Sequence, residues 1–155
     1  MDKHSQIILL GGAPTTGKST IAQALSLQLG LPWISTDHIR ELMRVTARRE
    51  DYPDLFEPEG YSAERYLTEF SAQEIADMEW RQSIATWIGI RSFIENNYTW
   101  RDGFIMEGVN ILPDLVARDL GDRQGIRTVF LVDSDVDRTR DVIFTRGLWG
   151  TASSY

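Results

Sequence analysis

The chain has 155 residues, 42% of them hydrophobic and 25% charged, which is enough to bury the core of one globular domain. Its formal net charge of −7 argues against a nucleic-acid-binding protein, because such proteins usually carry a basic surface. It has no cysteine, which excludes disulfides and thiolate metal sites, and no apolar run long enough for a membrane span, so we expect a cytoplasmic protein.

The first third of the sequence predicts two strands, each followed by a helix. Short apolar runs predict strands at Gln6–Gly11 and Trp33–Thr36, of the kind that is buried on both faces of a parallel sheet. Apolar residues four positions apart predict a helix over Lys18–Leu29, which Gly30 ends. Apolar residues on one side predict a second helix over Asp37–Arg49. The first strand, the first helix and the second strand together form a βαβ unit.

The rest of the sequence predicts mainly helices, with two further strands. Glu50–Ser62 contains two prolines and many acidic residues, which predicts a loop. The segment from Ala63 to about Asn97 is rich in Glu, Ala, Ile and Trp and predicts two helices. The last predicted elements are strands at Phe104–Glu107 and Thr128–Val132 and helices at Ile111–Gly121 and Asp135–Gly147.

A glycine-rich segment between the first predicted strand and helix carries the most specific motif. The residues from Gly12 to Ser19, GAPTTGKS, match G-x-x-x-x-G-K-[ST], the phosphate-binding loop. Backbone N–H groups and the helix N-terminus form an anion-binding hollow in such a loop, and glycine allows its tight turns. The alternative is a glycine-rich turn that only joins a strand to a helix. The predicted ligands of the ATP phosphates are Gly12, Ala13, Pro14, Thr15, Thr16, Gly17, Lys18, Ser19 and Thr20.

Two side chains of the loop, and one acid from another strand, have separate predicted roles. Lys18 is predicted to reach the β- and γ-phosphates of ATP, and the Ser19 hydroxyl to be a ligand of Mg²⁺. Glu107 ends the third predicted strand, where P-loop enzymes place an acid that holds Mg²⁺ or its waters. Because the usual acid there is Asp, contact with the phosphate acceptor is the alternative role of Glu107.

An acid and an arginine follow the second predicted strand. Asp37 lies at the carboxyl end of that strand, where open α/β sheets bind ligands, and is predicted to accept the proton of an attacking hydroxyl group. Arg40 lies one helical turn further on the same side and is predicted to bind an anionic acceptor. The alternative for Asp37 is a structural role as the N-cap of this helix.

Three arginines lie on the last predicted helix. A transferring phosphoryl group needs positive charge around it, which an arginine on a movable lid often supplies. Arg146, just before Gly147 at the helix end, is the predicted lid arginine. For Arg138 and Arg140 we favour a solvated helix surface with Asp–Arg pairs.

These features predict one α/β domain over residues 1–155, and its phosphate-loop motif resembles that of P-loop NTPases, which implies their three-layer sandwich of the nucleoside- and nucleotide-kinase type. The parallel sheet is predicted in the order 2-3-1-4, because the acid of the third strand must approach the phosphate loop from a neighbouring strand. A helical acceptor-side region is predicted over about 38–100, and a lid-like helix over about 135–147.

The sequence resembles the small-molecule kinase branch of P-loop proteins, and most of all the 2-phosphoglycerate kinase family. The resemblance rests on GGAPTTGKST, STDHIRELMR, FIMEGVNILP and LVDSDVDRTRDVIFTRG, in the family's order. It implies ATP-dependent phosphorylation of 2-phosphoglycerate to 2,3-bisphosphoglycerate, with Asp37 activating the acceptor hydroxyl and Arg40 and Arg146 holding phosphate groups. Kinases of this kind have a fifth strand after the lid, so we expect that strand and part of the adenine pocket to be missing from this sequence.

Two alternatives remain open. One is a kinase for a nucleotide, a sugar or a polynucleotide 5′ end, which the Asp-x-x-Arg pair would serve equally well, although the net charge argues against the polynucleotide. The other is a non-catalytic nucleotide-binding switch, for which the sequence lacks the N-K-x-D guanine motif of GTPases. We expect the partner to be a small-molecule phosphate acceptor, with neither nucleic acid nor membrane involved.

Overall fold

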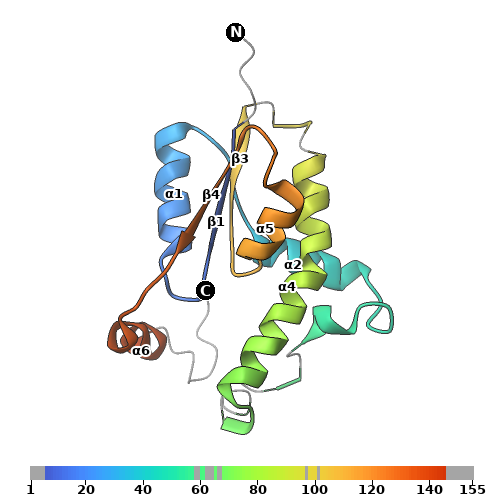
Figure 1. Ribbon diagram of the computed structural model, residues 1–155, viewed down its shortest axis with the longest axis vertical. Coiled ribbons are helices and arrows are strands. Elements are labelled where there is room, and N and C mark those ends of the chain that lie inside the picture. The colour runs from blue at the N-terminus through green and yellow to red at the C-terminus, as the bar shows by residue number, and fades with distance from the viewer. Residues whose placement is uncertain are drawn as a thin grey trace.

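The centre of the structure is a sheet of four parallel strands (Figure 1). The strands are β1 (Gln6–Gly12), β2 (Trp33–Ser35), β3 (Gly103–Glu107) and β4 (Ile126–Leu131). Their order across the sheet is β2-β3-β1-β4, so the predicted α/β class and the predicted strand order are confirmed. This computed structural model describes residues 6–57, 60–61, 65, 68–96, 98–100 and 102–145.

Helices cover both faces of the sheet (Figure 1). α1 (Lys18–Leu29) lies on one face, and α4 (Ala72–Glu95) and α5 (Pro113–Leu120) lie on the other. Successive side chains of a strand point to opposite faces, so Ile8 and Leu10 of β1 pack in the cluster that contains Ala22 of α1. Ile7 and Leu9 pack in the cluster that contains residues of α4 and α5. The two clusters form the core of the three-layer arrangement.

β4 begins at Ile126, two residues before the predicted start, and ends at Leu131. It is the edge strand of the described sheet, and exposed residues alternate along it with partly buried ones. The exposed Arg127 interrupts the apolar run on which the prediction rested, although Ile126 before it already pairs with Ile7 of β1.

Two predicted helical segments have different bounds in the structure. α2 (Thr36–Thr46) stops before the predicted end at Arg49, because Ala47 has an extended backbone with φ −84° and ψ 148°. α4 is one helix of 24 residues over the larger part of the segment in which two helices were predicted. The earlier part of that segment lies partly outside the described residues.

The remaining elements are short. The described part of the predicted acidic loop contains the 3₁₀ turn η1 (Pro53–Phe56), and the last described helix is α6 (Val136–Thr145). No helix within the described residues is both long and apolar enough to cross a membrane.

Candidate active site

The phosphate loop joins β1 to α1, and its backbone depends on two glycines. Gly12 has a φ of 143° and Gly17 a φ of 86°, both of which favour glycine. A Cβ atom at Gly12 would overlap the carbonyl oxygen of Leu131 on β4, whereas the space beside Gly17 is open. Thr15, with a φ of 69°, is the one described non-glycine residue with a positive φ. The sequence therefore builds a tightly curved loop immediately before α1.

The N-terminus of α1 is left open for an anion. Its N-cap is Gly17, which makes no side-chain cap, and no acidic residue lies in the first turn. The N–H groups of a first turn need acceptors, and the helix dipole favours negative charge there. In α4, by contrast, Ser71 and Glu74 form a capping box that satisfies these groups. The loop and the start of α1 thus fit the phosphate groups that the sequence predicts they bind.

Lys18 is the first residue of α1, and 7% of its surface is exposed. Its Nζ donates a hydrogen bond of 2.6 Å to the carbonyl oxygen of Ala13. Thr16 Oγ1 donates to the same oxygen at 2.9 Å. The lysine side chain therefore reaches back over the phosphate loop to Ala13.

The two predicted metal ligands lie together. Glu107, the last residue of β3, is 4% exposed, and its Oε1 accepts a hydrogen bond of 3.2 Å from Ser19 Oγ. Hydroxyl and carboxylate oxygens are ligands that Mg²⁺ prefers. In the described part of the chain, no group of three or more His, Asp or Glu side chains could hold a metal ion. The Ser19–Glu107 pair therefore fits a Mg²⁺ ion that takes its other ligands from water and phosphate oxygens.

Asp37 is not the N-cap of α2, so its purely capping role is ruled out. The N-cap is Ser35, whose Oγ accepts a hydrogen bond of 3.3 Å from the backbone N–H of Asp37. The Asp37 side chain is 57% exposed, which leaves its carboxylate accessible to a ligand. Because Ser35 caps the helix, the Asp37 side chain is available for another role.

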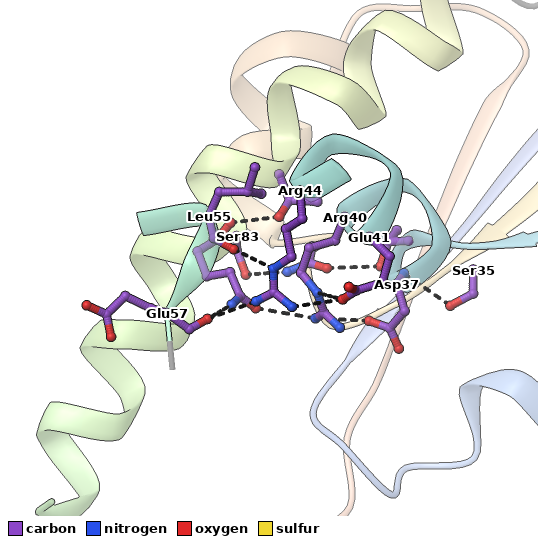
Figure 2. Close-up of polar contacts among 12 residues, drawn as sticks. Ser35, Asp37, Arg40, Glu41, Arg44, Leu55, Glu57 and Ser83 are labelled. Atoms are coloured by element: carbon purple, nitrogen blue, oxygen red, sulfur yellow. Dashed lines mark hydrogen bonds and ion pairs between the residues drawn. The ribbon is translucent and has the colours of Figure 1, made fainter. Parts of the chain in front are cut away.

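Arg40 pairs with Asp37 one turn along α2 (Figure 2). Its Nη1 lies 3.1 Å from Asp37 Oδ1, and its Nε lies 3.2 Å from Glu41 Oε1. The Arg40 side chain is only 19% exposed, so its guanidinium group is held against the protein. The structure therefore brings together the two residues that the sequence predicts for acceptor activation and acceptor binding.

A second arginine of α2, Arg44, binds η1 and the residue that follows it (Figure 2). Its Nε donates to the carbonyl oxygen of Leu55 at 2.8 Å, and its Nη2 donates to that of Glu57 at 3.2 Å. Gln82 of α4 donates to the same Glu57 oxygen through Nε2, and its Oε1 accepts from Arg40 Nη1 at 3.3 Å. Arg40, Arg44 and Gln82 thus form one polar network between α2, α4 and η1.

A buried chain of hydrogen bonds fixes the start of α2. Thr36 Oγ1 donates to Asn110 Oδ1 at 3.2 Å, and Asn110 Nδ2 donates to Ser83 Oγ at 3.2 Å. All three residues are at most 2% exposed. Gly108, after β3, lies so close to Thr36 that a Cβ atom there would overlap the threonine hydroxyl. These contacts fix Asp37, the next residue of α2, relative to the end of β3.

Sequence reasoning missed Arg44, Gln82 and Asn110. Gln82 lies in a row of buried α4 residues four positions apart, between Met78 and Thr86. A glutamine in a row of this kind is a usable signal, because a buried amide needs partners. No local pattern marks Asn110, whose partners come from α2 and α4.

The lid arginine cannot be placed with the other residues, since Arg146 lies outside the described residues. Arg138 of α6 is 64% exposed and pairs with Asp133 at 3.3 Å, which agrees with the solvated Asp–Arg pair favoured for it.

Comparisons with known proteins agree with the resemblance that the sequence motifs indicated. Residues 5–130 match the model of a family described as chloramphenicol phosphotransferase-like protein. A Methanococcus vannielii protein named 2-phosphoglycerate kinase is 38% identical over 133 residues, which cover 81% of this chain and 42% of that protein. A protein of the same name from Methanothermobacter thermautotrophicus is 32% identical over 150 residues, which cover 93% of this chain and 48% of that protein. The chain thus spans less than half the length of these curated relatives.

The fold is also found in a crystal structure of a Chloroflexus aurantiacus protein. The two structures have a TM-score of 0.54 and 22% sequence identity, over 92% of this chain and 66% of the other. The similarity to 2-phosphoglycerate kinases that the motifs indicated is confirmed by the curated relatives. Because the family model matches most of its length, the chain belongs to the chloramphenicol phosphotransferase-like family.

Proposed function

We propose that this chain is an ATP-dependent kinase that phosphorylates 2-phosphoglycerate to 2,3-bisphosphoglycerate, with Mg²⁺ as the metal. One observation carries the proposal: the phosphate loop, the acid of β3 and the start of α2 meet at the same edge of the sheet. In the sheet register, Glu107 pairs with Leu10 of β1 on one side and with Ser35 of β2 on the other. This register supports the proposal, because it pairs Ser35, two residues before Asp37, with the acid that contacts Ser19 of the loop.

The nucleotide side consists of the loop from Gly12 to Thr20. Its backbone N–H groups and Lys18 would hold the β- and γ-phosphates, and Ser19 and Glu107 would hold Mg²⁺. When bound, the metal neutralises negative charge on the phosphates. Positioning and charge compensation supply most of the catalysis in phosphoryl transfer, so these residues need no covalent role.

The acceptor side consists of Asp37 and Arg40. Asp37 would take the proton of the acceptor hydroxyl as that oxygen forms a bond to the γ-phosphorus. The bond between the γ-phosphorus and the bridging oxygen breaks, and ADP leaves. Arg40 would bind the carboxylate or phosphate of the acceptor through its guanidinium group. A phosphorylated acid offers two anionic groups of this kind, which agrees with the name that the curated relatives carry.

The proposal is tested by incubating the chain with Mg-ATP and a panel of phosphorylated acids, sugars, nucleosides and a 5′-hydroxyl oligonucleotide, and following ADP release. We expect 2-phosphoglycerate to raise ADP release far above the rate without an acceptor. Stimulation only by a sugar, a nucleoside or the oligonucleotide would support the alternative acceptors. Slow hydrolysis that no acceptor changes would support the nucleotide-binding switch.

A further inference from the structure

Gln82 is a buried glutamine whose amide oxygen and nitrogen each have a hydrogen-bond partner. It is 3% exposed and lies on the side of α4 that packs inward. A buried primary amide destabilises a protein unless its oxygen and nitrogen both find partners. Here the oxygen accepts from Arg40 Nη1 at 3.3 Å, and the nitrogen donates to the carbonyl oxygen of Glu57. Gln82 thus connects the predicted acceptor-binding arginine to the segment after η1.

The other partners of Arg40 differ from Gln82 in charge. Asp37 and Glu41 are carboxylates, which compensate the positive charge of the guanidinium group. The amide oxygen of Gln82 accepts a hydrogen bond from the same group without carrying a charge. Within the described residues, the hydrogen bonds of Arg40 use Nε and Nη1, and no hydrogen bond uses Nη2.

We propose that Gln82 is a positioning residue that orients the Arg40 guanidinium group for the anionic group of the acceptor. The inference rests on the proposed function. Gln82 fixes Nη1 from the buried side without adding a third negative charge beside the guanidinium group. The Glu57 carbonyl in turn orients the Gln82 amide, and Arg44 holds that carbonyl in place at 3.2 Å.

The experiment compares variants of the full chain by steady-state kinetics with Mg-ATP and 2-phosphoglycerate. Gln82→Met keeps the length of the side chain and removes both hydrogen bonds. We expect the acceptor KM to rise about tenfold or more, since a hydrogen bond to a charged group is lost, while the ATP KM stays at the parent value. Gln82→Glu offers Arg40 an oxygen but adds a negative charge, so we expect it to raise the acceptor KM as well.

Thr86→Val is the matched control. Thr86 is also buried on α4, and its Oγ1 donates to the backbone oxygen of Gln82 at 2.9 Å, a hydrogen bond that does not involve Arg40. We expect the acceptor KM of this variant to stay at the parent value. In an Arg40→Met background, Gln82→Met should have no further effect on the acceptor KM, because the two residues act as one unit.

A purely structural role for Gln82 predicts a different pattern. The melting temperature would fall in Gln82→Met, and either the acceptor KM would stay at the parent value or both KM values would rise together. Either result would overturn the inference. If Gln82→Met does not fold, Gln82→Glu decides. A parent-like acceptor KM in that variant would show that acceptor binding does not depend on the group that residue 82 presents to Arg40, and would overturn the inference. If the parent chain phosphorylates none of the acceptors, the proposed function fails and this inference fails with it. If the parent chain is active and Gln82→Met keeps the parent acceptor KM, only this inference fails.

Discussion

Ser19 and Glu107, which lie 88 positions apart in the sequence, are joined by a hydrogen bond of 3.2 Å from the serine hydroxyl to the carboxylate. The contact links the first turn of α1 to the carboxyl end of β3. It follows from the strand order, because β3 lies beside β1 and Glu107 pairs in register with Leu10. A serine at the start of one element and an acid at the end of another thus form one pair of oxygen donors.

Removal of the serine hydroxyl should weaken the use of Mg²⁺. We expect Ser19→Ala to raise the Mg²⁺ concentration for half-maximal turnover about tenfold or more, because one oxygen ligand is lost. The measurement is a Mg²⁺ titration of turnover at fixed ATP. Ser26→Ala is the control, since Ser26 lies on the same helix and its hydroxyl donates to the carbonyl of Leu31 at 2.7 Å. Equal Mg²⁺ titrations for the two variants would rule out Ser19 as a metal ligand.

Asp37→Asn should lower the rate of phosphoryl transfer without lowering stability. Because Ser35 caps α2, we expect the variant to keep its stability and its ATP affinity, while transfer falls by about 10²–10⁴-fold through loss of the proton acceptor. Ser35→Ala should show the reverse, with a loss of about 1 kcal/mol in stability and a much smaller effect on transfer. Transfer at the parent rate by Asp37→Asn would falsify the assignment of Asp37 as the base.

Gly108→Ala should destabilise the protein by about 1–3 kcal/mol, because its Cβ would overlap the hydroxyl of Thr36 at the rigid start of α2. Gly89→Ala on α4 is the contrast. Its Cβ would meet the thioether of Met43, a flexible side chain that can move aside, so we expect a much smaller loss. Urea unfolding measures both variants. Equal stabilities would show that the start of α2 is not held rigidly against the end of β3.

The carboxyl group of Asp119 should make the free energy of unfolding depend on pH. Hydrogen bonds from Arg118 at 2.7 and 2.8 Å, and from the indole of Trp87 at 2.7 Å, lower the pKa of its carboxyl group below the usual value. A lowered pKa in the folded state gives stability that is present above about pH 4 and is lost as the pH falls through the folded-state pKa. We expect Asp119→Asn to flatten the decline in unfolding free energy that the parent shows between pH 5 and pH 2. Identical slopes in urea unfolding would disprove the contribution of Asp119.

The parts of the fold that could be predicted from the sequence are the buried strands and the strand order that the phosphate site requires. β3 is buried at all of its residues and was found by its apolar run, and the strand order followed from the need for Glu107 to reach the loop. The start of β4 was missed because an edge strand exposes alternate residues, so Arg127 breaks its apolar run. The end of α2 was placed too late, since the change of backbone at Ala47 has no local mark such as glycine or proline.

The residues of the candidate site also divide into those that local motifs indicate and those that they do not. Lys18, Ser19 and Asp37 stand in local motifs whose spacing indicates their roles, and the structure places Ser19 against Glu107. The contacts of Gln82 and Asn110 join segments far apart in the sequence, and such pairings depend on how α2 and α4 pack. Local spacing carries no information on that packing.

The most direct test of the proposed kinase activity is phosphorus NMR of the full chain with Mg-ATP and 2-phosphoglycerate. We expect the signals of ADP and of a bisphosphorylated product to rise in equal amounts as those of ATP and 2-phosphoglycerate decline. Lys18→Ala should lower that rate about 100-fold or more, because a charge partner of the transferring phosphoryl group is lost. Release of free phosphate without a bisphosphorylated product, or an unchanged rate in Lys18→Ala, would contradict the proposal.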